Sequence, residues 1–199
     1  MAEIDPRLSE AIDRFRELLE QARETDLREP TAMTLATADA AGRPSARTVL
    51  LKGVDERGFV FYTNRGSRKG RALRENAQGA LLFFWQPLMR QVKIEGPVEG
   101  VTDAEADAYW ATRPRESQLG AWASHQSEPL ASREEYEARL AELREQYREQ
   151  EIPRPPFWSG FRVCPDRIEF WHEREFRQHD RECYWYDRGN GWQWTLLNP

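Results

Sequence analysis

Apolar residues near the start of the chain recur at steps of three and four positions. They are Ile4, Leu8, Ile12, Phe15, Leu18, Leu19 and Ala22. This spacing places them on one face of a helix. Asp5 followed by Pro6 is typical of a helix start, since Asp accepts a bond from a free backbone N–H and proline suits the first helical position. The pattern therefore predicts an opening helix whose apolar face packs against the rest of the protein.

After residue 31 the pattern changes to short apolar runs that are typical of β-strands. The runs cover 32–38, 43–54, 59–63, 80–85 and 89–101. The segments 39–42 and 55–58 each begin with Asp and end with Gly, residues that hairpin turns favour. Several short strands joined by such turns predict an antiparallel barrel.

Two predicted helices interrupt the second half of the chain. Capping boxes mark their starts, at Thr102-x-x-Glu105 and Ser132-x-x-Glu135. The apolar stripe of the second helix lasts only a few turns, which favours a packed surface helix over a coiled coil. Strands return at 157–163, 167–171, 183–186 and 192–196, with Asn190-Gly191 as a hairpin turn. We expect one domain over 1–199, made of an N-terminal helix (1–28), first strands (29–101), a helical region (102–152) and closing strands (153–199).

Composition narrows the classes of function. A chain of 199 residues suits one domain with a full core. Its formal net charge of -5 argues against a general nucleic-acid binder, which needs a basic surface. No apolar run approaches the length of a membrane span, and the first residues lack the features of a signal peptide. The two cysteines, Cys164 and Cys183, are far apart and form no CxxC motif. We therefore expect a cytoplasmic protein with no membrane or nucleic-acid partner.

The segment 177–181, Arg-Gln-His-Asp-Arg, carries more polar chemistry than a turn needs. In an extended chain Arg177, His179 and Arg181 would point to the same face and could grip one flat ligand. The alternative is a structural or solvated histidine. The three histidines of the chain show no HxH or HExxH spacing, so no metal site is expected.

Two further clusters suit anions. Ser67, Arg68 and Lys69 stand where a helix should begin, and exposed N–H groups there can bind a phosphate together with the two cations. The alternative is a solvated helix end. Tyr109, Arg113 and Ser117 offer hydroxyl and guanidinium donors that suit a phosphate monoester, or else Arg113 merely caps a helix.

Arg47 and Lys52 lie five residues apart on one apolar run. In a regular strand they would point to opposite faces. We therefore expect these two cations to bind different groups, unless the strand bulges between them. The alternative is an edge strand whose charges lie in solvent.

These motifs, taken in order, resemble the pyridoxamine 5′-phosphate oxidase family, also called the pyridoxine 5′-phosphate oxidase family. Any one motif is weak, but the ordered set is specific and spans most of the chain. The matching segments are RTVLLK (47–52), FYTNRGSRK (61–69), RQV (90–92), RPRESQLGAW (113–122), HQS (125–127), FWSGFRV (157–163), IEFW (168–171) and RQHDR (177–181). The resemblance implies a mostly β fold with helical excursions, a split β-barrel that binds FMN at a homodimer interface.

The resemblance also implies roles for individual residues. It implies FMN contacts, some from the second subunit, at Arg47, Val49, Leu50, Lys52, Tyr62, Thr63, Arg68, Lys69, Gln91, Gln126, Ser127, Trp171 and Arg181. It implies a grip on the substrate phosphate by Lys52, Tyr109, Arg113 and Ser117. Arg177 and His179 are implied as catalytic residues that bind against the pyridine ring of the substrate.

The implied reaction moves hydride from C4′ of pyridoxamine or pyridoxine 5′-phosphate to N5 of FMN, and gives pyridoxal 5′-phosphate. Dioxygen then reoxidises the flavin and becomes hydrogen peroxide. Two rival interpretations are an FMN oxidase of another aromatic substrate, of the phenazine-pathway type, and a non-catalytic flavin or pyridoxal-phosphate binding protein. Phenazine-type substrates need no phosphate grip, so the intact set around Arg113 argues against the first rival.

The chain departs from the family pattern at both ends. Few residues precede the first helix, and the family's C-terminal Arg-Leu-x-Pro lacks its arginine within 195–199. We expect from these departures a comparatively open site that retains pyridoxal phosphate weakly away from the flavin.

Overall fold

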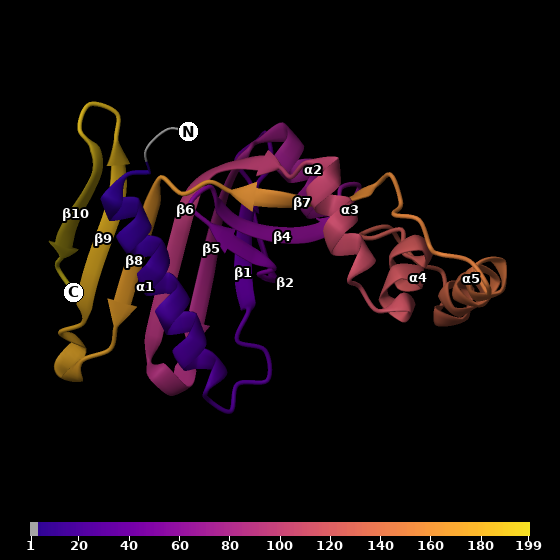
Figure 1. Ribbon diagram of the computed structural model, residues 1–199, viewed down its shortest axis with the longest axis horizontal. Helices are drawn as coiled ribbons and strands as arrows, with labels where there is room; N and C mark the ends of the chain where they lie inside the picture. The colour runs from indigo at the N-terminus through magenta and orange to yellow at the C-terminus, as the bar shows by residue number, and fades with distance from the viewer. Residues whose placement is uncertain (1–3) are drawn as a thin grey trace.

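The computed structural model describes residues 4–199 (Figure 1). Its helices are α1 (Pro6–Arg23), α2 (Arg68–Glu75), α3 (Asp103–Ala111), α4 (Arg115–Ala123) and α5 (Arg133–Gln146), with short 3-10 turns η1 (Gln86–Leu88) and η2 (Glu175–Arg177). Its strands are β1 (Ala32–Ala38), β2 (Pro44–Leu50), β3 (Gly53–Asp55), β4 (Gly58–Asn64), β5 (Gln78–Trp85), β6 (Arg90–Gly100), β7 (Trp158–Val163), β8 (Arg167–His172), β9 (Asp180–Asp187) and β10 (Gly191–Leu197).

The ten strands form one curled antiparallel sheet. Its main path runs β10-β9-β8-β6-β5-β1-β2, and β3, β4 and β7 branch from it. Strand β6 joins the two parts, because its first residues pair with β8 whereas 98–100 pair with β7. The sheet therefore closes only partly around its core, and this split barrel confirms the predicted fold class.

Helix α1 covers the inner face of the sheet (Figure 1). Asp5 caps the helix and Pro6 is its first residue, as the sequence predicts. Phe15 is fully buried and packs edge-on against Phe59 and Phe83, with ring centroids 4.9 and 5.0 Å away. Burying a side chain of this size stabilises the fold by about 1.5–3 kcal/mol. The opening helix is thus held by the barrel core.

Helices α3, α4 and α5 project from one end of the barrel around a small second core (Figure 1). Thr102 and Glu105 form the predicted capping box. The same Glu105 carboxylate accepts a 2.7 Å bond from the buried Arg162, which holds the pKa of Glu105 at about 2. This ion pair fixes the start of α3 against β7, and α3 in turn positions Tyr109.

The structure corrects two boundaries. The predicted run 43–54 is divided into β2 and β3, because Leu51 bonds to Thr31 and Lys52 bonds to Val60 through their backbone amides. Helix α4 was not predicted, since its nine residues begin after Pro114 with no side-chain cap. The predicted turns are present, and Gly58 has φ +138° with its missing Cβ only 2.1 Å from the Val163 oxygen.

No helix within residues 4–199 has both the length and the apolar character needed to cross a bilayer.

Candidate functional site

A lysine at the start of α2 lies among neutral oxygen atoms. Lys69 Nζ donates to Gln126 Oε1 at 2.6 Å, to Thr63 Oγ1 at 3.1 Å and to Ser67 Oγ at 3.3 Å. Ser67 is the helix cap and is completely buried. Thr63 and Gln126, separated by more than sixty positions in the sequence, meet at 3.3 Å. The fold therefore gathers the predicted cofactor residues of this segment around one ammonium group.

Two arginines complete this cluster, which we call the cation cradle (Arg47, Arg68, Lys69). The Arg47 guanidinium donates to the Leu35 carbonyl at 3.0 Å and to Thr37 Oγ1 at 2.9 Å. The Arg68 backbone amide donates to Ser127 Oγ at 3.1 Å. A pocket of about 200 Å³ lies beside Arg47 and Arg68.

The cradle has no acidic partner. Across residues 4–199 no carboxylate lies within ion-pair distance of Arg47, Arg68 or Lys69. Burial and the nearby charge of Arg47 lower the pKa of Lys69 to about 8. Burial and the charge of Arg68 likewise lower the pKa of Arg47. Repulsion between these half-buried positive charges destabilises the protein when no anion is bound. A bound anion would neutralise the charges and remove that repulsion.

A second cluster lies on the other side of β4. Tyr62 alternates with Thr63 along the strand and turns away from the cradle to stack on Tyr109, with ring centroids 4.1 Å apart. Arg113 lies over the Trp158 ring at 4.8 Å and donates to the Ser117 carbonyl at 2.9 Å. Burial lowers the pKa of Arg113. The structure thus brings three predicted substrate residues, Tyr109, Arg113 and Ser117, together beside aromatic rings.

Lys52 departs from its predicted setting. It lies between β2 and β3 and not within a regular strand, so the expected opposite facing of Arg47 and Lys52 does not follow from strand alternation. Its side chain is exposed. Val49 and Leu50, at the end of β2, are half-buried.

A third group lies in one row across three strands. Gln91 on β6 pairs with Trp171 on β8, which pairs with Arg181 on β9. We call these three residues the outer row. Arg181 donates twice to Glu169 Oε1, at 2.9 and 2.8 Å, and once to the Asn198 carbonyl at 3.0 Å. Unlike the cradle, this row has its cation neutralised within the chain.

The loop before β9 corrects another expectation. Arg177, His179 and Arg181 do not lie on one extended strand, because β9 begins at Asp180 and Arg177 has φ +62°. His179 instead lies beside the outer row, with its ring 4.6 Å from that of Trp171. Its Nδ1 accepts a bond from the Arg174 amide at 3.2 Å. In the neutral ring Nε2 therefore carries the proton and is the donor.

The cradle and the outer row lie on opposite faces of the sheet. Arg47 pairs with Leu35, which is fully buried on the inner face. Gln91 pairs with Phe84, which is 51% exposed on the outer face. Strands β1, β5 and β6 also separate β2 from β8. A single chain therefore does not bring the two groups onto one surface.

Several residues of these groups were not assigned a role from the sequence. Thr37 holds Arg47, Glu169 holds Arg181, and Trp158 supports Arg113. Trp158 and Glu169 stand inside motifs that the sequence comparison used, FWSGFRV and IEFW. Only their pairing across strands shows what they contact.

The chain matches two protein-family models. Residues 18–147 match the model described as pyridoxamine 5′-phosphate oxidase, and residues 158–199 match the pyridoxine 5′-phosphate oxidase C-terminal dimerisation region. Among curated proteins, the pyridoxine/pyridoxamine 5′-phosphate oxidase of Myxococcus xanthus (strain DK1622) is 60% identical over 94% of this chain and 91% of its own length. The corresponding protein of Rubrobacter xylanophilus is 58% identical over 94% of this chain and 86% of its own length.

Solved structures agree on the fold. PhzG from Burkholderia lata 383, solved in complex with tetrahydrophenazine-1-carboxylic acid, has a TM-score of 0.90 and 34% identity, covering 100% of this chain and 99% of that chain. A pyridoxamine 5′-phosphate oxidase-related, FMN-binding protein of Nostoc punctiforme has a TM-score of 0.68 and 17% identity over 100% of this chain and 99% of that one.

Proposed function

The chain belongs to the pyridoxamine 5′-phosphate oxidase family, and we propose that it uses FMN to oxidise pyridoxamine or pyridoxine 5′-phosphate to pyridoxal 5′-phosphate. Dioxygen is the final electron acceptor and becomes hydrogen peroxide. The observation that carries the assignment of FMN is the cation cradle, three positive side chains that form no ion pair within residues 4–199.

The cradle fits the phosphate of FMN. Arg47, Arg68 and Lys69 would each pair with phosphate oxygens, and Ser127 would line the same place. Charge-assisted bonds of this kind contribute about 1.5–3 kcal/mol each. When bound, FMN supplies the two-electron acceptor for the substrate's hydride. The protein's own contribution is to hold FMN and the substrate in the correct relative orientation.

The aromatic cluster on the other side of β4 suits the substrate phosphate. Arg113 is half-buried and donates one bond to a carbonyl through one terminal nitrogen, and its Nε is buried without a partner. The other terminal nitrogen is the donor that would bind an anion. The hydroxyls of Tyr109 and Ser117 and the ammonium of Lys52 are the other expected contacts. These contacts would anchor the substrate by its phosphate, away from the reacting carbon. They would therefore contribute to binding and orienting the substrate.

The outer row and the adjoining loop suit the flat rings. Trp171, Gln91 and Arg181 would contact the flavin, and the Nε2 proton of His179 would be donated to the substrate ring beside it. Arg177 is expected at the same ring. Because the cradle and the outer row occupy opposite faces of one chain, we infer that each flavin is held by the cradle of one subunit and the outer row of its partner. The protein is on this account a homodimer, in agreement with the dimerisation region that its C-terminal residues match.

A second candidate activity is oxidation of a reduced phenazine. It is favoured by the likeness to PhzG, which was solved with such a ligand. A phenazine carboxylate carries no phosphate, so it would not need a second phosphate-binding cluster. The cluster of Arg113, Tyr109 and Ser117 therefore favours the phosphorylated substrate.

One assay tests the proposed function. The purified protein should be yellow with bound FMN and should convert pyridoxamine 5′-phosphate to pyridoxal 5′-phosphate with an equal amount of hydrogen peroxide. Pyridoxamine without its phosphate is the matched control and should react poorly. Turnover of a reduced phenazine in place of these substrates would favour the second candidate. Flavin binding without turnover of either would contradict the assignment as an oxidase.

A further inference from the structure

A buried arginine on β7 joins the barrel to the first of the projecting helices. The Arg162 side chain is 4% exposed. Its guanidinium donates to Glu99 of β6 at 3.2 Å and to Glu105 of α3 at 2.7 Å. Its Nε is buried and has no hydrogen-bond partner within residues 4–199. The two ion pairs therefore offset much of the cost of burying this charge.

The two carboxylate oxygens of Glu105 have different partners. Oε2 accepts bonds from the backbone amide and the hydroxyl of Thr102, both at 2.9 Å, and these bonds belong to the helix cap. Oε1 accepts the bond from Arg162 and lies 3.1 Å from the more exposed Arg57. Capping therefore needs only an oxygen atom at this position, whereas the link to β7 also needs the negative charge.

Tyr62 of β4 fixes the same helix at a second point. Its hydroxyl donates to the Glu105 carbonyl at 3.3 Å, and its ring stacks on Tyr109, four positions further along α3. A Cβ at Gly160 of β7 would lie 2.8 Å from the Tyr62 ring, so a side chain there would displace the ring. The next residue of β4, Thr63, contacts the cation cradle. One strand thus carries contacts of both the cradle and the substrate cluster, and α3 is held at a defined place beside it.

A second arginine contacts α3 from the segment before β7. Arg154 donates to Asp107 at 2.5 Å and to Asp103 at 2.8 Å. These two carboxylates are 61% and 84% exposed, and ion pairs with exposed groups contribute little. The buried Arg162 is therefore the stronger electrostatic constraint on the position of the helix.

We propose that Arg162 and Glu105 are positioning residues for substrate binding, whose ion pair holds Tyr109 and Arg113 where they can bind the substrate phosphate. Neither member of the pair is expected to touch the substrate or the flavin. A small displacement of α3 would weaken the phosphate contacts and leave the cradle, on the other side of β4, unchanged. The inference rests on the proposed function, since it takes the substrate phosphate as the ligand of Arg113.

The test compares pyridoxamine 5′-phosphate with pyridoxamine in steady-state kinetics of the flavin-loaded protein. Glu105→Gln keeps an oxygen for the helix cap and removes the charge that Arg162 binds. The KM for pyridoxamine 5′-phosphate should rise by roughly three- to tenfold, because charged contacts to the phosphate are weakened and not lost. The kcat, the FMN affinity and the kcat/KM for pyridoxamine should stay close to the wild-type values, because other residues hold the flavin and the pyridine ring.

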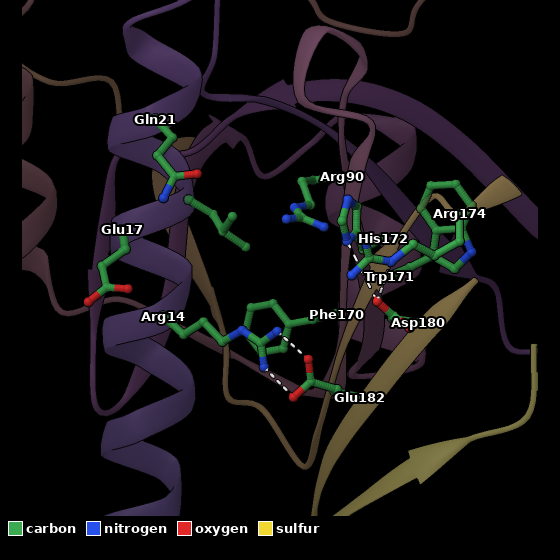
Figure 2. A pocket seen from close by; sticks show the side chains of 11 residues that line it. Arg14, Glu17, Gln21, Arg90, Phe170, Trp171, His172, Arg174, Asp180 and Glu182 are labelled. Carbon is green, nitrogen blue, oxygen red and sulfur yellow. Dashed lines mark hydrogen bonds and ion pairs between the residues drawn. The ribbon is translucent and has the colours of Figure 1, made fainter. Parts of the chain in front are cut away.

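Two controls separate positioning from a general loss of stability. Glu99→Gln removes the other acidic partner of Arg162, which lies on β6 and not on α3. Figure 2 shows a comparable pair elsewhere in the fold, in which Arg14 of α1 donates to both oxygens of Glu182 at 2.7 and 2.5 Å. Glu182→Gln therefore also weakens the contact between a helix and the sheet. Both control variants should keep the wild-type preference for the phosphorylated substrate.

A variant of the arginine tests whether the two residues act through one contact. Arg162→Lys keeps the charge but lacks the fixed fork of donors that reaches both carboxylates, and it should reduce the same preference. In the double variant Glu105→Gln, Arg162→Lys the reduction should be no larger than the greater of the two single effects, because both changes break one contact.

The proposal would be overturned if Glu105→Gln kept the full preference, or if it lost activity on both substrates equally together with FMN affinity. A reduction of the preference by Glu99→Gln or Glu182→Gln as large as that by Glu105→Gln would also overturn it. A wild-type protein without a preference for the phosphorylated substrate would contradict the proposed substrate cluster and this inference together. A preference that is present in the wild type and unchanged in Glu105→Gln contradicts this inference alone.

Discussion

The cation cradle and the outer row both contain predicted cofactor residues, but they treat charge in opposite ways. In the cradle Arg47, Arg68 and Lys69 form no ion pair within residues 4–199, although Asp39 and Glu75 line the adjoining pocket. In the outer row Arg181 is bonded to Glu169, which also lies 3.2 Å from Lys93. The first region is therefore electrostatically incomplete in the flavin-free chain, whereas the second is complete before any ligand arrives.

This difference separates two ways of building a binding site. A group that must capture an anion keeps unpaired cations and gives up some stability of the empty protein. A group that must present a flat surface pairs its charges internally and relies on the strand register for its geometry. Mutations in the two regions should therefore change flavin affinity and stability in different proportions.

The largest expected effect is on FMN affinity in the double variant Arg47→Met, Lys69→Met. Losing two charged bonds to phosphate should weaken FMN binding by about 3–6 kcal/mol, roughly 10²- to 10⁴-fold. Stability of the flavin-free protein should stay the same or rise, because repulsion between like charges is removed. Fluorescence titration and urea unfolding measure the two quantities.

Two controls sharpen this first prediction. Riboflavin has no phosphate, so its affinity should be similar in the wild type and the double variant. Arg74→Met removes an exposed charge from the last turn of the same helix and should leave FMN affinity unchanged. A double variant that loses riboflavin and FMN equally would move the cradle's role away from the phosphate.

The opposite balance is expected for Arg181→Met in the outer row. Glu169 is 3% exposed and keeps only Lys93 and Arg167 as ion-pair partners once Arg181 is removed, so the loss of its charged hydrogen bonds should cost about 1.5–3 kcal/mol. Urea unfolding of the flavin-free protein should show this loss, unlike the cradle variant. Combining it with Glu169→Gln should restore most of the stability. If Arg181→Met alone leaves the flavin-free protein as stable as wild type, the internal pairing of the outer row has been overstated.

Arg113→Ala should affect the substrate and not the cofactor. The variant loses one charged hydrogen bond to the substrate, which contributes about 1.5–3 kcal/mol. The KM for pyridoxamine 5′-phosphate should rise by the factor that corresponds to this energy. Steady-state kinetics and FMN titration on the same preparation separate the two effects. An equal loss of FMN affinity would place Arg113 at the cofactor's phosphate.

The smallest expected effect is a pH dependence of FMN binding from Lys69. In the flavin-free protein its pKa falls from 10.5 to about 8. Between these values the unfolded chain binds more protons than the folded one, so stability should rise with pH over that range. A bound phosphate favours the charged lysine, so FMN affinity should fall, and binding should take up protons, above about pH 8. Lys69→Arg remains charged throughout and should abolish the proton uptake in calorimetry.

Much of the fold could be predicted from the sequence, because local rules agree with the final structure. The apolar period of the first helix, the caps at Asp5 and Thr102, and the Asp–Gly turns all act over a few residues. Helix α4 could not be predicted in this way, since no capping side chain marks its start. The bend of the chain at Leu51 and Lys52 was missed because its cause is bonding to distant segments at Thr31 and Val60.

The sequence named candidate site residues, but it could not give their arrangement. The ordered motifs named Arg47, Lys69 and Trp171, yet nothing local shows that the cradle and the outer row lie on opposite faces. That fact depends on which residues pair across the sheet. Arg177 was misplaced for a related reason, since its positive φ breaks the strand alternation that the sequence pattern assumed.

The most direct test of the shared flavin site is activity in mixed dimers. One parent is Arg47→Met, Lys69→Met, and the other is Arg177→Ala, His179→Ala; each alone should be almost inactive. The two parents are unfolded and refolded together, and different tags on the two chains verify that mixed dimers form. Each mixed dimer should contain one site made of the intact cradle of one chain and the intact loop of the other. Statistical mixing gives mixed dimers in about half of the population with one working site of two, so about a quarter of wild-type activity should return. Mixed dimers that form but remain inactive would contradict a site shared between subunits and would place the whole flavin site within one chain.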